Sequence, residues 1–271
     1  MSNEVIFESD RMEPGFDNIP GQWGTIWLFQ GSKENNINFA TIKNATIGLL
    51  VENEPTPAIP KLTIKNSKIY NSSNFGILGR ATSITAENVV LNNAGQSAFA
   101  GTYGGTYNFT HCTITNYWSN SFRQFPALYL NNFLMPEDNS TVTNDLIAAN
   151  FNNCIIYGND NPEFLVEKDE GAAFNFKFTN CLIQFKDSNN KFASDPNYDF
   201  NNTAFYNTIV FNKDPDFKDP LKNKMMIGEK SGAIGVLGNN PFSNQVPTDI
   251  LNKNRSSAPD LGAFQHTIFE E

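Results

Sequence analysis

The sequence predicts an all-β fold in which the chain winds as a parallel β-helix, with three short strands per coil and about 22–27 residues per coil. Two observations lead to this prediction. A short phrase recurs along the chain at spacings of 22 to 42 residues, and apolar residues alternate with polar ones before each copy. The composition agrees, because a chain with 24 Phe and many Asn residues favours strands joined by Asn-rich turns over helices.

The recurring phrase is an apolar residue, a polar residue, an Asn or His, a residue that is small in most copies, and an aliphatic residue two positions later. Coils of a β-helix stack about 4.8 Å apart, so equivalent positions lie above one another. Asn tolerates a left-handed backbone, and its amide can bond to the amides above and below. The phrase therefore predicts one corner of the coil with a structural ladder. The predicted ladder residues are Asn44, Asn66, Asn88, His111, Asn153, Asn180 and Asn207.

The three cysteines, Cys112, Cys154 and Cys181, each follow a ladder residue. The side chain at this position must be small because it is packed inside the corner of the coil, so we expect buried, unpaired thiols. The chain has no C-x-x-C motif, and neither a metal site nor a cofactor is predicted. Of the two histidines, His111 is expected to be a buried ladder residue and His266 to be peripheral.

The strands of each coil follow from apolar residues at alternate positions. Leu62 and Ile64 precede one ladder residue, and Phe176 and Phe178 precede another. A third strand is predicted in each of several coils, at 24–29, 48–52, 75–79, 97–101 and 127–131.

The third strands also predict an outward aromatic column. If Ile26 and Leu128 point inward, Trp27 and Tyr129 point outward, and the same alternation places Phe99 outward. Such a column is a candidate sugar-stacking surface. The alternative is that a loop or a partner subunit covers it.

Two insertions are expected, near 116–147 and near 159–173. The first contains Trp118 and Arg123, which we add to the candidate ligand-binding residues because long loops on a rigid scaffold often carry function. It also holds Asp138 and Asp145, whereas the second is strongly acidic. These acids, including Glu163, are expected to be solvated loop charges, and no set at matching coil positions predicts catalytic residues.

The whole chain, 1–271, is interpreted as one domain with a closing segment near 231–271, where Arg255 and Asp260 are expected to pair. A net charge of −9 without a basic patch argues against a nucleic-acid partner. No apolar run reaches the roughly 18 residues of a membrane span. Because a strand-like run begins at Val5, we expect further residues of the protein before Met1.

Three stretches resemble a known family. They are "IKNSKIYN" at 64–71, the opening "FESDRMEPGFDNIPGQWGTIW", and the end "SGAIG" followed by "APDLGAF". They are similar to secreted right-handed parallel β-helix proteins of Bacteroidetes, many of them lipoproteins, within the pectin-lyase-like superfamily. The resemblance implies a right-handed coil, and a protein that is secreted, periplasmic or anchored at the outer membrane. It also implies that an export signal and a first coil or cap precede Met1.

The expected function is binding of a polysaccharide or a surface protein without catalysis. One alternative is a polysaccharide lyase or glycoside hydrolase of the pectin-lyase-like kind, which rests on fold analogy. The other is a structural spacer in a surface lipoprotein.

Overall fold

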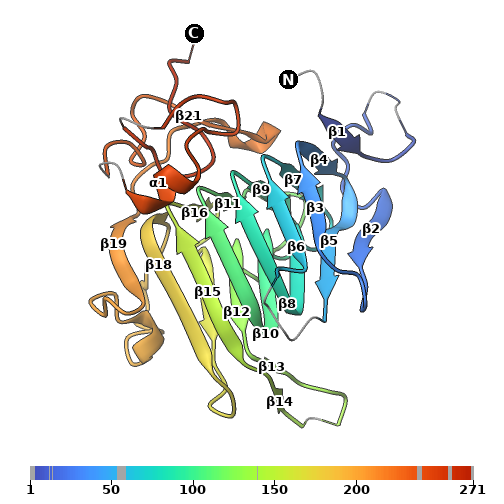
Figure 1. Ribbon diagram of the computed structural model, residues 1–271, viewed down its shortest axis with the longest axis vertical. Coiled ribbons are helices and arrows are strands. Elements are labelled where there is room, and N and C mark those ends of the chain that lie inside the picture. The colour runs from blue at the N-terminus through green and yellow to red at the C-terminus, as the bar shows by residue number, and fades with distance from the viewer. Residues whose placement is uncertain are drawn as a thin grey trace.

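The structure is a computed structural model that describes residues 4–269, apart from positions 12, 14, 54–58, 139, 237–239 and 256–257. Seventeen strands form one sheet in which every pairing is parallel, and the sheet winds around an elongated core (Figure 1). The predicted parallel β-helix is confirmed. No helix among the described residues is long and apolar enough to cross a membrane.

Most coils contribute one strand to each of three faces, and the last coil, which ends in β19, contributes to the second and third faces. The first face contains β2 (Trp23–Leu28), β5 (Ala45–Glu52), the first half of β8 (Ile77–Glu87), the first half of β10 (Phe99–Thr110), β12 (Leu128–Asn131) and β17 (Phe164–Glu167). The second face contains β3 (Asn35–Asn38), β6 (Leu62–Lys65), the second halves of β8 and β10, β15 (Leu146–Asn152), β18 (Phe174–Ile183) and β19 (Tyr206–Phe211). The third face contains β1 (Val5–Phe7), β4 (Ala40–Lys43), β7 (Lys68–Ser72), β9 (Val90–Ala94), β11 (Thr113–Asn116), β16 (Ile155–Gly158) and the ends of β18 and β19.

The core consists of inward side chains stacked coil upon coil. On the second face, the rings of Phe109, Phe151, Phe178 and Tyr206 follow one another with centroid separations of 5.3, 5.0 and 5.8 Å. These separations match the spacing of neighbouring parallel strands, so the backbone repeat itself brings the rings into contact. Burying such rings supplies much of the apolar area that stabilises the coil.

The corner between the second and third faces carries the predicted ladder. Asn66, Asn88, His111, Asn153 and Asn180 have left-handed φ angles between 46° and 55°. Asn88 Nδ2 donates to Asn66 Oδ1 at 3.1 Å, and Asn180 Nδ2 donates to Asn153 Oδ1 at 3.0 Å. These five positions of the ladder are confirmed.

Asn44 lies at a different corner from the one predicted. It belongs to a second ladder after the third face, in which Asn71 donates to Asn44 Oδ1 at 3.2 Å and Asn93 donates to Asn71 Oδ1 at 2.6 Å. The place below Asn66 is taken by Phe39, with φ 53°. Both corners need a left-handed residue followed by a small one, so the phrase at Asn44 matches either.

Asn207 is the second correction to the ladder. The register pairs Thr179 with Asn207, so Thr208, with φ 56°, takes the place above Asn180. Asn207 is exposed and lies on the outer surface of the second face.

The three cysteines are buried and free, as predicted. Each thiol lies 3.3–3.6 Å from backbone carbonyl oxygens, to which it can donate. Burial raises the pKa of the Cys112 and Cys154 thiols well above the usual value. They therefore act as small packing residues of the corner.

Both predicted insertions contain a regular strand of the first face. These strands are β12 and β17, so only the segments around them leave the coil. The largest excursion is an antiparallel hairpin of β13 (Phe133–Leu134) and β14 (Val142–Thr143), which projects at the lower end of Figure 1.

The C-terminal segment, residues 213–269, runs along the outside of the third face. It contains β20 (Phe217–Asp219), β21 (Lys224–Ile227) and the short helix α1 (Pro241–Gln245). Its buried residues Phe264 and Leu261 belong to two apolar clusters with the outward side chains Val90 and Ile155. The segment forms a second layer in place of a final coil, and it begins before the predicted boundary at 231.

Arg255 is fully buried in this layer, but its predicted partner is different. Its guanidinium donates to Asn88 Oδ1 at 2.9 Å and to the carbonyl oxygen of Gly262 at 3.1 Å. The Asp260 carboxylate instead pairs with His266 Nδ1 at 2.7 Å. Arg255 thus ties the C-terminal layer to the ladder, and the expected Arg255–Asp260 side-chain pair is not formed.

Candidate ligand-binding groove

The outward column of the first face differs from the prediction at one position. Trp27, Leu50, Leu78, Ala100, Tyr129 and Leu165 lie next to one another in register. Phe99 pairs with Ile77, points into the core and has no exposed surface. Its predicted outward orientation is wrong, and Ala100 takes the outward place.

The loop 117–127 covers the middle of this column. The Phe125 ring lies 5.1 Å from the Tyr129 ring, whose hydroxyl donates to Glu167 Oε2 at 2.5 Å. Trp118 is also buried, and its indole N–H donates to Ser121 Oγ at 3.0 Å. Tyr129 and Trp118 therefore offer little surface to a ligand.

Arg123 is buried in the same loop and forms a two-point ion pair with Glu163. Its two terminal nitrogens donate to the two carboxylate oxygens at 2.8 and 2.6 Å. Backbone N–H groups of Ala127 and Asp160 each donate to Glu163 at 2.8 Å. Burial raises the pKa of Glu163, although Arg123 opposes the shift. The expectation that Glu163 is a solvated loop charge is wrong, because it anchors this loop.

Trp27 alone among the five predicted ligand-binding residues has a largely exposed side chain, at 50%. The Phe29 ring packs edge-on against it at 4.8 Å, and its indole N–H donates to Glu52 Oε2 at 2.8 Å. This pair is an exposed aromatic surface on the first face.

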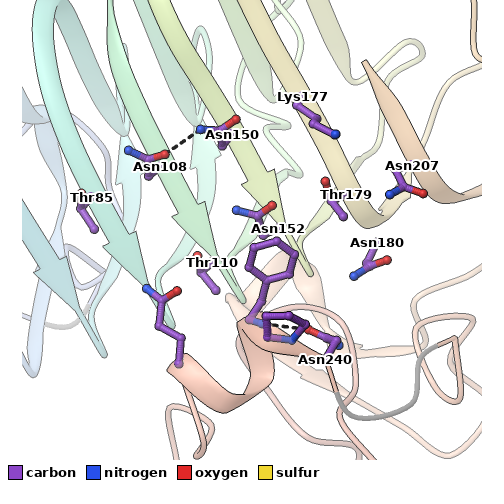
Figure 2. A pocket seen from close by; sticks show the side chains of 13 residues that line it. Thr85, Asn108, Thr110, Asn150, Asn152, Lys177, Thr179, Asn180, Asn207 and Asn240 are labelled. Atoms are coloured by element: carbon purple, nitrogen blue, oxygen red, sulfur yellow. Dashed lines mark hydrogen bonds between the residues drawn. The ribbon is translucent and has the colours of Figure 1, made fainter. Parts of the chain in front are cut away.

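An open groove of about 830 Å³ lies instead on the outer surface of the second face (Figure 2). Its floor comes from the strands β8, β10, β15, β18 and β19, and its wall is α1. The lining residues are Thr85, Asn108, Thr110, Asn150, Asn152, Lys177, Thr179, Asn180, Asn207, Asn240, Pro241, Phe242 and Gln245.

The floor consists of two polar rows that run across the strands. One row places Thr85, Asn108, Asn150 and Lys177 side by side, and the other places Thr110, Asn152, Thr179 and Asn207 side by side. They alternate along the strands with inward core residues such as Phe109, Phe151 and Phe178, so the period of two directs them outward. A polar group thus recurs about every 4.8 Å along the groove.

Most of these side chains have hydrogen-bonding capacity to spare. Asn150 donates to Asn108 at 2.8 Å, whereas Asn152, Thr179 and Lys177 make no side-chain hydrogen bond to any described residue. An amide offers donors and an acceptor, a hydroxyl offers both, and an ammonium group only donates. The floor can therefore bond to a ligand with many hydroxyl groups.

The wall of the groove is fixed to the ladder. Asn240 caps α1 by accepting from the backbone N–H groups of Phe242 and Ser243 at 3.1 and 3.2 Å. Asn153 Nδ2 donates to Asn240 Oδ1 at 3.0 Å. Phe242 is half-buried and lines the groove, so a ring stands beside the polar floor.

The charge of the groove is slight. Among the described lining residues, Lys177 is the one charged side chain, and none is an Asp or a Glu. In the described part of the chain no three His, Cys, Asp or Glu side chains gather in a way that could hold a metal ion. The arrangement suits recognition of a neutral or weakly anionic polar ligand.

Sequence reasoning missed this groove, although a signal existed. The rows could have been read as Asn, Thr or Lys recurring at the polar positions between core phenylalanines in successive coils. The wall of the groove could not have been predicted in this way, because α1 is about 90 residues from the floor strand that contains Asn150. Comparison of the chain with protein-family models, curated proteins and solved structures gives no match.

Proposed function

We propose that the protein is a carbohydrate-binding β-helix that holds a glycan in the groove of the second face without cleaving it. The main support is the pair of polar rows, whose side chains repeat once per coil beside the Phe242 ring. Hydroxyl groups of a sugar match amide and hydroxyl side chains, and the apolar face of a sugar ring packs on an aromatic ring.

The groove lacks the groups that glycoside hydrolysis uses. Hydrolases place two carboxylates on either side of the scissile bond, and the described lining of this groove supplies none. Asp138 and Asp145 are exposed, and the hairpin beside them lies at the opposite end of the second-face strands from α1 (Figure 1). The hydrolase alternative therefore has less support than binding.

We also propose that the protein belongs to the pectin-lyase-like superfamily and acts outside the cell or at its surface. The support is the resemblance of the corner phrase, the opening and the closing segment to exported β-helix proteins. The proposed glycan groove is compatible with that location.

Two aromatic residues provide the test, because the half-buried Phe242 lines the groove and the exposed Trp27 lies on the first face. A glycan array would identify a ligand, and titration calorimetry would then compare Phe242→Ala with Trp27→Ala. We expect Phe242→Ala to weaken binding about tenfold, which is about 1.4 kcal/mol, and Trp27→Ala to leave it unchanged. Lys177→Ala and Asn152→Ala should also weaken binding, with the β-sheet circular dichroism unchanged.

Three results would contradict the proposal. Loss of binding in Trp27→Ala alone would move the ligand to the first face. Release of reducing ends or unsaturated products would identify an enzyme. Absence of binding across the array would favour a structural spacer.

A further inference from the structure

A second pocket, of about 310 Å³, lies between the third face and the C-terminal layer. Its apolar part includes Val90, Met225 and Phe264, which are at most 6% exposed. Tyr70 and Met226, which are partly buried, add to this apolar lining. The volume is at the lower end of the range for small-molecule sites.

Three lysines line this pocket, although the chain carries a net charge of −9. Lys68 Nζ lies 3.2 Å from Glu4 Oε1, and Lys222 Nζ lies 3.1 Å from Asp219 Oδ2. Lys224 makes no ion pair or side-chain hydrogen bond with any described residue. The pocket therefore combines an apolar interior with an excess of positive charge at its edge.

The wall of the pocket is held in place by bonds to the third face. Asn92 Nδ2 donates to Asn223 Oδ1 at 2.8 Å and to the carbonyl oxygen of Pro220 at 3.0 Å. Asn223 Nδ2 in turn donates to Asn71 Oδ1 at 3.0 Å. These bonds fix the turn between β20 and β21, which places Lys222 and Lys224, so little ordering is needed when a ligand binds.

We propose that this pocket binds a small organic anion with an apolar body, such as an aliphatic or aromatic carboxylate. The apolar body packs on Val90, Met225 and Phe264, and the carboxylate lies between Lys222 and Lys224. An inorganic anion would leave the apolar interior unfilled, and a neutral apolar molecule would leave the cations unused. The pocket is separate from the groove of the second face, so the two proposals stand independently.

The test compares ligands that share one chain and differ in the head group. Octanoate, octanol and octylammonium would be titrated against the full chain at low ionic strength and followed by protein NMR. We expect octanoate to bind most tightly, with shifts at Met225, Met226 and Phe264. Lys224→Gln should weaken octanoate at least fivefold, whereas Lys186→Gln, which removes an exposed lysine on another part of the chain, should not.

A second variant tests the apolar part, because Met226→Ser should weaken octanoate and octanol together. Equal affinity for octylammonium, or equal loss in Lys224→Gln and Lys186→Gln, would overturn the proposal. So would the absence of octanoate binding in the unmodified chain. Phe242→Ala should leave octanoate binding unchanged, which separates this result from the glycan test.

Discussion

His111 occupies a position that asparagines fill in the neighbouring coils, and its ring must be neutral to do so. Asn153 Nδ2 donates to His111 Nε2 at 2.9 Å, so that nitrogen has to accept. Burial, with a contribution from the Arg255 charge, lowers the pKa of His111 well below 6.5. A protonated ring would lose its bond to Asn153 and place a second positive charge near Arg255.

The fold should therefore lose stability in mild acid through this one residue. The unfolded chain binds a proton at His111 below pH 6.5, whereas the folded chain does not. Because the folded pKa is depressed, the stability is fully present above the unfolded pKa and declines as pH falls. We expect the titration of His111 to lower the free energy of unfolding by about 1.4 kcal/mol for each pH unit below 6.5. Urea unfolding between pH 5 and 8 would measure this decline.

His111→Asn is the matched variant, since it restores the side chain of the neighbouring ladder positions. Its unfolding free energy should decline less steeply below pH 6.5 than that of the unmodified chain. Equal slopes in the two proteins would show that other groups cause the acid sensitivity.

Single residues also show how far the sequence predicts the ladder and the candidate site. The corner phrase identified five ladder positions because each needs a left-handed residue and a small neighbour. It failed at Asn44 because two corners share this requirement. Phe99 was misplaced because alternation was followed within one strand, whereas the 22-residue period from Ile77 leads to Phe99 itself.

At the scale of elements, the loop 117–127 depends on one buried ion pair. Arg123 and Glu163 are 5% and 0% exposed, and 40 residues separate them in the sequence. A pair of this kind is weak as a source of net stability, because both charges are desolvated. Removing one partner is costly, because the other charge stays buried without compensation.

We therefore expect Arg123→Met to lower the free energy of unfolding by about 3–5 kcal/mol. The double variant Arg123→Met/Glu163→Leu should recover much of that loss, since no charge is then left unpaired. Urea unfolding gives the energies, and Trp118 fluorescence reports whether the loop still covers the first face.

The exposed pair Lys168–Glu170 provides the control in the adjacent segment. Its nitrogen and oxygen are 2.7 Å apart, but the Glu170 side chain is 85% exposed. Lys168→Ala should change stability by no more than about 0.5 kcal/mol. A similar loss in Arg123→Met and Lys168→Ala would contradict the anchoring role.

Sequence reasoning could not find this anchor, because the two partners come from different insertions. Each charge taken alone matches a solvated loop residue, and burial depends on how the loops fold over the first face. The strand β17 was missed for a related reason, since it lies inside an acidic, irregular spacing, whereas the apolar run at 127–131 did predict β12.

For the whole molecule, the three faces have different surroundings, and this difference determines where a ligand can bind. The loop 117–127 covers part of the first face, and the C-terminal layer covers much of the third. The second face has α1 at one end and remains open along its polar rows (Figure 1). A coil with one open polar face suits binding of an extended ligand along the stack.

The C-terminal layer should unfold together with the coil, because it shares clusters with the third face. Leu261 is fully buried with Ile155 and Leu182, whereas Leu221 in the same layer is 66% exposed. We expect Leu261→Ala to cost about 2–5 kcal/mol and Leu221→Ala less than about 0.5 kcal/mol. Calorimetry should show one transition at a lower Tm for Leu261→Ala. A separate early transition, with amide protection in β11 and β16 retained, would show instead that the C-terminal layer is an independent unit. The covering of the third face by this layer would then no longer explain why the groove lies on the second face.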